Sequence, residues 1–173
     1  MRQFKVALAI ALAAILQSSL GGIWPPLIFI NLPLIVAVYY ALRRELAVSL
    51  LVAALSGVAA DSLSGGLLGA GGFSNTVAVF LTASLALRVM VDNPLARIPM
   101  LAGATAIATM VYIGLHYLLG QAIPYHPIVE WVAKQLFATT AVGSLVMLII
   151  DNFFSERARQ RRQFATRRKF SRR

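Results

Sequence analysis

Asp61 is the residue with the clearest chemical potential, because it is the one carboxylate placed near the end of an apolar run rather than in a loop or tail. A carboxylate within or beside hydrocarbon is costly unless it is hydrogen-bonded, paired or hydrated. A helix cap or loop anchor needs no ligand, whereas an isolated carboxylate makes a poor proton relay. We therefore expect Asp61 to accept hydrogen bonds from the backbone of Ser62–Gly66 or from neighbouring side chains, with a proton or cation site as the alternative.

Small residues surround Asp61, and more of them recur four apart in a later apolar run. Glycine permits close approach of two backbones, and serine can cap a helical turn. Small residues four apart allow membrane helices to pack closely, which serves either packing within the chain or contact with a partner helix. The candidate structural and partner-contact residues are Gly57, Asp61, Ser64, Gly65, Gly69, Ala104 and Ala108.

Residue types that support catalysis or metal binding are scarce. The chain has no cysteine, which removes disulfides, thiolate nucleophiles and Cys-based zinc sites. His116 and His126 do not have a metal-ligand spacing, and we expect His116, beside Tyr112, to be a packing residue. The sequence holds no phosphate loop, Gly-x-Ser-x-Gly elbow, His-Glu-x-x-His motif or carboxylate pair within one apolar run. We therefore expect a protein that is not an enzyme, with no catalytic, cofactor-binding or metal-binding residues.

The composition is that of a membrane protein with a basic tail. Of the 173 residues, 59% are hydrophobic and 13% are charged, against roughly 45–50% and about 25% in soluble domains. Residues 151–173 alone hold nine basic and two acidic residues. The sequence therefore predicts a transmembrane domain over residues 1–151 and a polybasic cytoplasmic tail over residues 152–173. Next to a membrane, such a tail is expected to contact anionic lipid headgroups or, second, an acidic partner, rather than nucleic acid.

Six apolar runs are candidates for transmembrane helices, each of which takes about 20 residues. Residues that end helices or suit the headgroup region separate the runs, among them Pro25, Pro94 and Gly120. We therefore predict an all-α membrane protein with six transmembrane helices. The predicted spans are Phe4–Gly22, Pro26–Leu42, Leu46–Leu63, Phe73–Val91, Ile98–Leu119 and Trp131–Ile150.

Basic residues fall almost entirely on one side of this six-span arrangement. All but one of the 16 Lys and Arg residues lie near the two termini or at the second and fourth connections. Because cytoplasmic loops retain basic residues, both termini are expected to be cytoplasmic. Lys134, the exception, lies one turn inside the last span, where its side chain can extend to the interface. Four polar residues at membrane depth are expected to face other helices: Gln17, Ser18 and Ser19 in the first span and Asn31 in the second.

Two motifs follow one another in the second and third runs. The second run contains Pro33 and continues into Tyr39-Tyr-Ala-Leu-Arg-Arg44. The third ends in Gly57-Val-Ala-Ala-Asp-Ser-Leu-Ser-Gly65, which is followed by Leu68-Gly69 and a fourth run. In order and spacing, over about residues 33–90, this pattern resembles the rod-shape-determining MreD family of bacterial inner-membrane proteins. The number of runs and the length of the chain agree with that family over nearly the whole sequence.

The resemblance implies a fold and a set of partners. The family is similar in fold to the substrate-binding S components of vitamin transporters, which are six-helix membrane bundles. The resemblance implies that this chain is a non-enzymatic subunit of the cell-elongation machinery in the bacterial inner membrane, with a role in cell shape. Such a subunit would bind MreC, a single-span periplasmic protein, and through it act with MreB filaments and the peptidoglycan synthases RodA and PBP2.

Two classes of function remain open from the sequence: a scaffold that binds partner helices, and an S-component-like binding subunit of a small-molecule (vitamin) transporter. A vitamin binder needs converging polar and aromatic groups that enclose a ligand. The outer ends of the spans and their loops hold several such groups without an obvious cluster, and we therefore favour the scaffold. These groups are Trp24, Asp61, Asn75, Tyr125, His126 and Glu130.

Overall fold

The computed structural model describes residues 8, 10–17, 19, 25–64, 67–88, 94–120 and 127–170. Within these ranges, all of the regular secondary structure is helical, and residues 10–17 form helix as well. The elements that follow are a short 3-10 helix and five α-helices. They are η1 (Pro25–Phe29), α2 (Leu32–Leu42), α3 (Leu46–Ser64), α4 (Ala70–Arg88), α5 (Pro94–Leu118) and α6 (Ile128–Phe170).

Within the described residues, four helices are long and apolar enough to cross a membrane. Their apolar segments are Leu46–Leu63, Ala70–Arg88, Ala96–Leu118 and Ile128–Ile150. They coincide, within a few residues at each end, with the third to sixth predicted spans. The chain is therefore an all-α protein with the helices of a multi-pass membrane protein.

The second predicted span, Pro26–Leu42, is not one helix. The 3-10 helix η1 ends at Phe29, and α2 then has 11 residues, fewer than the roughly 20 that cross a bilayer. Asn31 starts α2 by accepting a hydrogen bond from Leu34 N at 3.1 Å, and Pro33 in the first turn lacks an N–H and clashes with a preceding helical turn. The prediction of six continuous spanning helices is wrong here, and the first run is described only at residues 8, 10–17 and 19.

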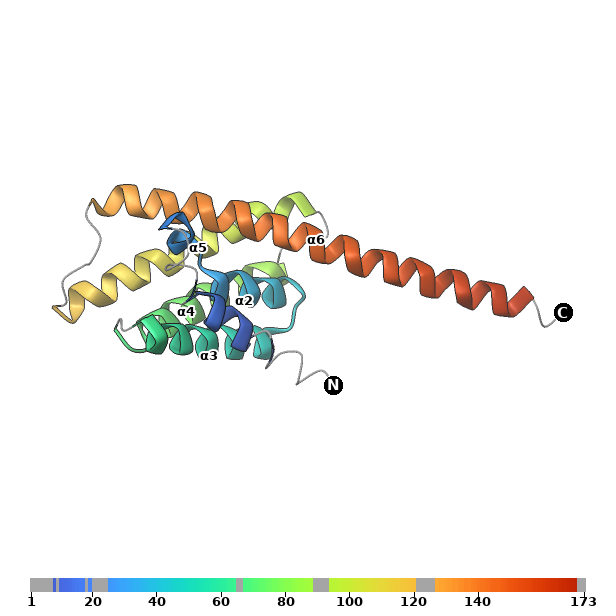
Figure 1. Ribbon diagram of the computed structural model, residues 1–173, viewed down its shortest axis with the longest axis horizontal. Helices are drawn as coiled ribbons and strands as arrows, with labels where there is room; N and C mark the ends of the chain where they lie inside the picture. Colours follow the sequence, from blue (N-terminus) through green and yellow to red (C-terminus); the bar gives the residue numbers. More distant parts are fainter. Residues whose placement is uncertain are drawn as a thin grey trace.

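Helix α2 lies at the centre of the bundle (Figure 1), where it packs against α3, α4, α5 and α6. A helix that is apolar on all sides belongs in an interior, and α2 buries side chains around most of its circumference. Helix α4 also packs against α3 and α5, and α6 packs against α5 and η1. The largest apolar side chains that are fully buried between these helices are Leu34, Ile35, Val38, Val52, Val79 and Leu101.

Helix α6 continues without a break from the bundle through the predicted domain boundary at residue 152. It has 43 residues and ends at Phe170, and its second half projects away from the other helices (Figure 1). At 1.5 Å per residue, the part after Ile150 extends roughly 30 Å. The backbone of the predicted polybasic tail is therefore helical as far as Phe170.

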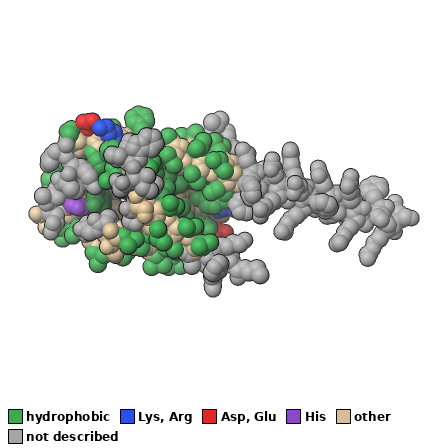
Figure 2. Space-filling view, viewed as in Figure 1, with side chains coloured by type: hydrophobic (Ala, Val, Ile, Leu, Met, Phe, Trp, Pro, Cys, Tyr) green, Lys and Arg blue, Asp and Glu red, His purple; other side chains and the backbone are tan. Residues whose placement is uncertain are grey.

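The exterior of the described bundle is largely apolar. Figure 2 shows hydrophobic side chains over most of the visible face, with charged groups at its ends. Leu51 and Leu55 on α3 are more than half exposed, as are Phe73 on α4 and Phe137 on α6. Large exposed apolar surfaces are rare on soluble monomers, and this surface suits a hydrocarbon environment.

Candidate functional site

Asp61 lies near the end of α3, and its carboxylate reaches the start of α4. Its Oδ2 atom accepts hydrogen bonds from the backbone N–H groups of Gly69 at 3.1 Å, Gly71 at 2.8 Å and Gly72 at 3.3 Å. The first N–H groups of a helix have no carbonyl partner within it, and a negative charge there is favoured by the helix dipole. Asp61 therefore acts as a remote cap for α4.

The acceptor role predicted for Asp61 is confirmed, but its described donors differ from the prediction. Helix α3 continues to Ser64, so the N–H groups of Ser62 and Leu63 belong to the helix and are not available to the carboxylate. Gly65 and Gly66 lie outside the described residues. Sequence spacing alone indicates the residues next to Asp61 as its hydrogen-bond donors. In the structure, the start of α4 returns to the carboxylate and supplies the donors instead.

Next to Asp61, helices α3 and α4 cross with their backbones in contact. A Cβ atom placed on Gly57 would lie 2.5 Å from Cα and 2.7 Å from N of Gly72, closer than real Cβ atoms come to backbone. A Cβ atom on Gly71 would collide with Oδ1 of Asp61. Glycine is thus required at this crossing, and Gly57 has a packing role within the chain. We call this crossing, together with the hydrogen bonds of Asp61, the Asp61 joint.

Asn31 is the centre of a second polar network, at the break before α2. Its backbone N–H donates to Oγ1 of Thr139 on α6 at 3.1 Å, and its Nδ2 donates to Oδ1 of Asn75 on α4 at 3.0 Å. Next to it, the backbone N–H of Leu32 donates to Oε1 of Gln17 at 2.9 Å. The expectation that Gln17 and Asn31 face other helices is confirmed. These bonds connect four separate segments where the second span is interrupted.

A cavity of about 300 Å³ lies between the two networks, and every helical segment of the described chain contributes to its wall. Its polar lining groups are amides, hydroxyls and one carboxylate, and its aromatic ones are Tyr112 and Trp131. By the predicted orientation, these residues all belong to the outer half of the bundle. We call it the polar cavity, and it is lined by Gln17, Ile28, Ile30, Asn31, Pro33, Gly57, Ala60, Asp61, Gly71, Ser74, Asn75, Ala108, Thr109, Tyr112, Trp131 and Gln135.

Of the outer groups named from the sequence, Asp61 and Asn75 line the polar cavity and Glu130 does not, while Trp24, Tyr125 and His126 lie outside the described residues. Asn75 is part of α4 and is 3% exposed, and Oγ1 of Thr109 lies 3.3 Å from the side-chain amide of Gln135 across the α5–α6 interface. One signal for this cluster is present in the sequence. Asn75, Thr109 and Gln135 are each a polar residue within a predicted apolar run.

The remaining predicted site residues are distributed as follows. Ala104 and Ala108 on α5 are 1% and 3% exposed, so they pack within the bundle, and neither forms an outer face for a partner helix. Gly69 has a positive φ of 89°, a conformation that favours glycine. Ser64 is the last residue of α3, and Gly65 lies outside the described residues.

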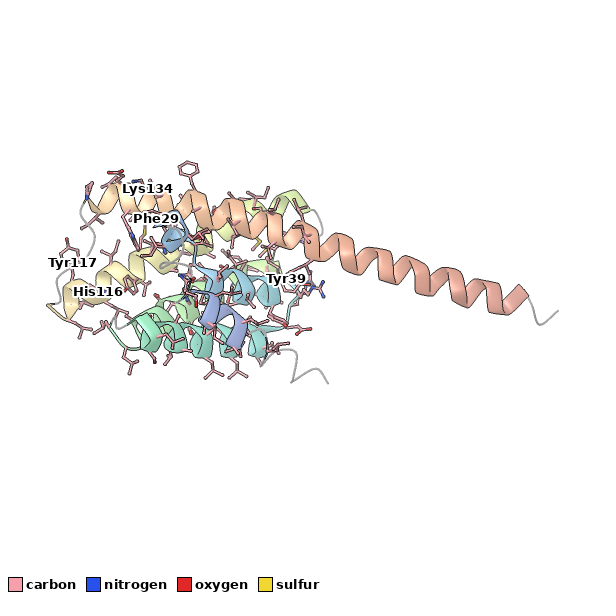
Figure 3. The ribbon with its side chains drawn as sticks, viewed as in Figure 1. Phe29, Tyr39, His116, Tyr117 and Lys134 are labelled. Atoms are coloured by element: carbon pink, nitrogen blue, oxygen red, sulfur yellow. The ribbon has the colours of Figure 1, made fainter. Side chains whose placement is uncertain are left out.

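Two further polar side chains near this end of the bundle, His116 and Lys134, have local partners. His116 is 5% exposed, its Nδ1 lies 3.0 Å from the carbonyl oxygen of Tyr112, and the two rings are 4.4 Å apart. It is a packing residue, as predicted. Lys134 pairs with Glu130 at 2.6 Å and lies over the ring of Phe29 (Figure 3). Both charged side chains are more than half exposed, in agreement with a lysine that extends to the interface.

Comparison of the chain with protein-family models, with curated proteins and with solved structures finds no match. The function of the chain is therefore inferred from its own residues and geometry. Two features bear on function: the Asp61 joint, which is structural, and the polar cavity, which has the size and lining of a binding site.

Proposed function

We propose that this protein is a non-enzymatic membrane scaffold of the rod-shape-determining MreD type. It would hold the single transmembrane helix of an MreC-like partner in the bacterial inner membrane. Through that partner it would connect MreB filaments with the peptidoglycan synthases RodA and PBP2, and so contribute to cell shape. No substrate would be converted or carried.

The observation that supports this proposal most is the use of the motif behind the resemblance. The Asp61 joint contains three residues of that motif: Gly57, Asp61 and Gly69. One carboxylate oxygen of Asp61 accepts three backbone N–H bonds there, and the glycine crossing brings the backbones of α3 and α4 into contact. A motif of this kind fixes the relative position of two membrane helices. That is what a scaffold needs to present a constant surface to its partner.

In this proposal the chain crosses the membrane six times, with both termini in the cytoplasm. Helices α3 to α6 make four crossings, residues 4–22 make the first, and η1 with α2 makes the second as a broken segment. The broken segment is tolerable because its interruption is buried among protein groups that satisfy its backbone. The basic residues after Ile150 would contact anionic lipid headgroups where α6 leaves the membrane.

Topology is tested with reporter fusions, and fusions after Gly69 and after Gln121 are expected to report the periplasm. Fusions after Arg44 and Arg97 are expected to report the cytoplasm, because basic residues remain on that side. Single-cysteine variants at the same positions give an independent readout, since the chain has no native cysteine. A cytoplasmic signal at Gly69 would show that the crossings are assigned wrongly.

The partner helix is expected to pack on the outer side of α6. Only 17% of the residues in the spanning part of α6 are buried within the described bundle, against 50% of those in α4. A row of exposed residues four apart runs along this helix, and large and small side chains alternate in it as far as Leu145. We call it the α6 ridge, and it consists of Val129, Ala133, Phe137, Ala141, Leu145 and Ile149.

Bulky residues on the α6 ridge are expected to release the partner. Small residues let two membrane helices approach closely, so A133W and A141W together should lower the yield of co-purified MreC-like protein by about tenfold or more, equivalent to ~1.4 kcal/mol. The amount of inserted protein should stay the same. L55W on α3, where Leu55 is 54% exposed, is the control and should keep the partner. Equal partner yields from both variants would exclude this face.

A second candidate function, favoured by the polar cavity, is an S-component-like binding subunit of a small-molecule (vitamin) transporter. The cavity lies at the end of the bundle expected to face outward, where such a subunit would receive its substrate. The two candidates differ in what cells lose without the protein. Loss of rod shape supports the scaffold, and loss of vitamin uptake with normal shape supports the transporter subunit.

A further inference from the structure

We propose that the polar cavity is a binding site for a small uncharged molecule that carries several hydroxyl or amide groups. Its volume of about 300 Å³ is at the lower end of the range of small-molecule sites, roughly 300–1,000 Å³. The site depends only on the walls of the cavity. It therefore stands whether the protein is a scaffold or a transporter subunit.

Asn75 presents a hydrogen-bond donor to the cavity. The orientation of its amide follows from Asn31, whose Oδ1 accepts from Leu34 N at 3.1 Å, so that the Asn31 group facing Asn75 is the donor Nδ2. That Nδ2 donates at 3.0 Å to Asn75, which fixes Oδ1 of Asn75 at this contact. The residue is 3% exposed, no described hydrogen bond uses its Nδ2, and this atom is not among the fully enclosed polar atoms that lack a partner. The Nδ2 of Asn75 is therefore accessible from the cavity, where a ligand acceptor would satisfy it.

Gln135 and two aromatic residues complete the recognition surface. The side-chain amide of Gln135 lies 3.3 Å from Oγ1 of Thr109, whose hydroxyl proton is donated to Thr105 O at 2.8 Å. Gln135 therefore adds a second amide group to the wall. Tyr112 and Trp131 line the same cavity from α5 and α6. Aromatic faces beside amide groups suit a compact ring or a planar group with polar substituents.

The charges of the wall select a neutral ligand. The described lining holds no lysine or arginine that would attract an anion. Its carboxylate, Asp61, already accepts three N–H bonds through Oδ2, so its charge is compensated without a cation. A hydrocarbon chain would leave the Nδ2 donor of Asn75 without a hydrogen bond.

The test uses the full chain, purified in detergent, and three pairs of probes that differ in charge. The uncharged probes are glucose, nicotinamide and uridine, and their charged counterparts are gluconate, nicotinate and uridine monophosphate. Binding is followed by the fluorescence of Trp131 in a W24F background and by thermal unfolding. Native mass spectrometry of the protein as purified reports any bound small molecule. At least one uncharged probe or co-purified uncharged molecule is expected to bind saturably, and at least tenfold more tightly than its charged counterpart.

Variants separate recognition from folding. N75L removes the donor and Q135M removes the second amide at similar side-chain volume, and each is expected to weaken binding about tenfold. T82V is the matched control on α4, because Thr82 is buried and its hydroxyl donates to Ala78 O at 2.8 Å, away from the cavity. If N75L fails to fold, Q135M carries the test.

The proposal is overturned if no uncharged probe binds and no small molecule co-purifies, which would mean that water fills the cavity. It is also overturned if charged and uncharged probes bind alike, or if a folded variant of the cavity binds as the wild type does. If no MreC-like partner co-purifies but the uncharged probes still bind, the result counts against the scaffold and supports this site.

Discussion

Replacing Asp61 by leucine is expected to destabilise the protein by about 3 kcal/mol or more. Three backbone N–H groups at the start of α4 lose their shared acceptor, and a hydrogen bond to a charged group contributes roughly 1.5–3 kcal/mol. The three bonds share one oxygen atom, so their contributions do not add in full. The measurement is the apparent melting temperature in detergent, together with the fraction of monodisperse protein.

The conservative variant D61N is the control for charge. An asparagine can place its Oδ1 where Oδ2 of Asp61 accepts from Gly69, Gly71 and Gly72, and we expect a loss of about 1 kcal/mol. A folded protein that loses function equally and completely with both variants would contradict the structural role. It would point instead to a function that depends on the charge, such as proton or cation binding.

Replacing Gly57 by valine is expected to abolish the folded state. A Cβ atom at this position meets backbone atoms of Gly72 at 2.5 and 2.7 Å, and backbone cannot move aside as a flexible side chain can. Even alanine should cost about 2–3 kcal/mol, because α3 and α4 must separate. The readout is the yield of monodisperse protein and its melting temperature.

Matched controls for Gly57 are available on α5. Gly103 and Gly114 have nothing within 4 Å of an added Cβ atom, so G103A and G114A should be tolerated. Because alanine is the better helix former, each is expected to change stability by no more than about 1 kcal/mol in the favourable direction. Equal damage from G57A and G103A would show that the α3–α4 crossing is not the tight contact described.

The long helices were predictable because their apolar runs are long and their connections contain strong helix-breaking residues. The break in the second span was harder to predict. Its apolar run is continuous, and only the capping of α2 by Asn31 and the position of Pro33 decide where the helix begins. A sequence pattern reports composition along a run, whereas a cap depends on three-dimensional partners such as Thr139 and Asn75.

The candidate site was predictable in part for a similar reason. Asp61 stood out as a carboxylate in an apolar setting, and its acceptor role followed. The donors to Asp61 could not be predicted in the same way, because they lie eight to eleven residues further along the chain. Ala104 and Ala108 have the spacing of a helix interface, but spacing does not tell whether that interface lies inside the bundle, as it does here.

The central proposal is that this chain is a scaffold for an MreC-like membrane helix, and affinity purification from native membranes of a bacterium that carries the gene tests it most directly. Partners are identified by mass spectrometry, and cell shape and vitamin uptake are recorded in a deletion strain. We expect an MreC-like single-span protein to co-purify in a fixed ratio, and cells without the protein to become round. Recovery of no such partner, with rod shape retained and uptake of a vitamin lost, would contradict the scaffold and support the transporter subunit.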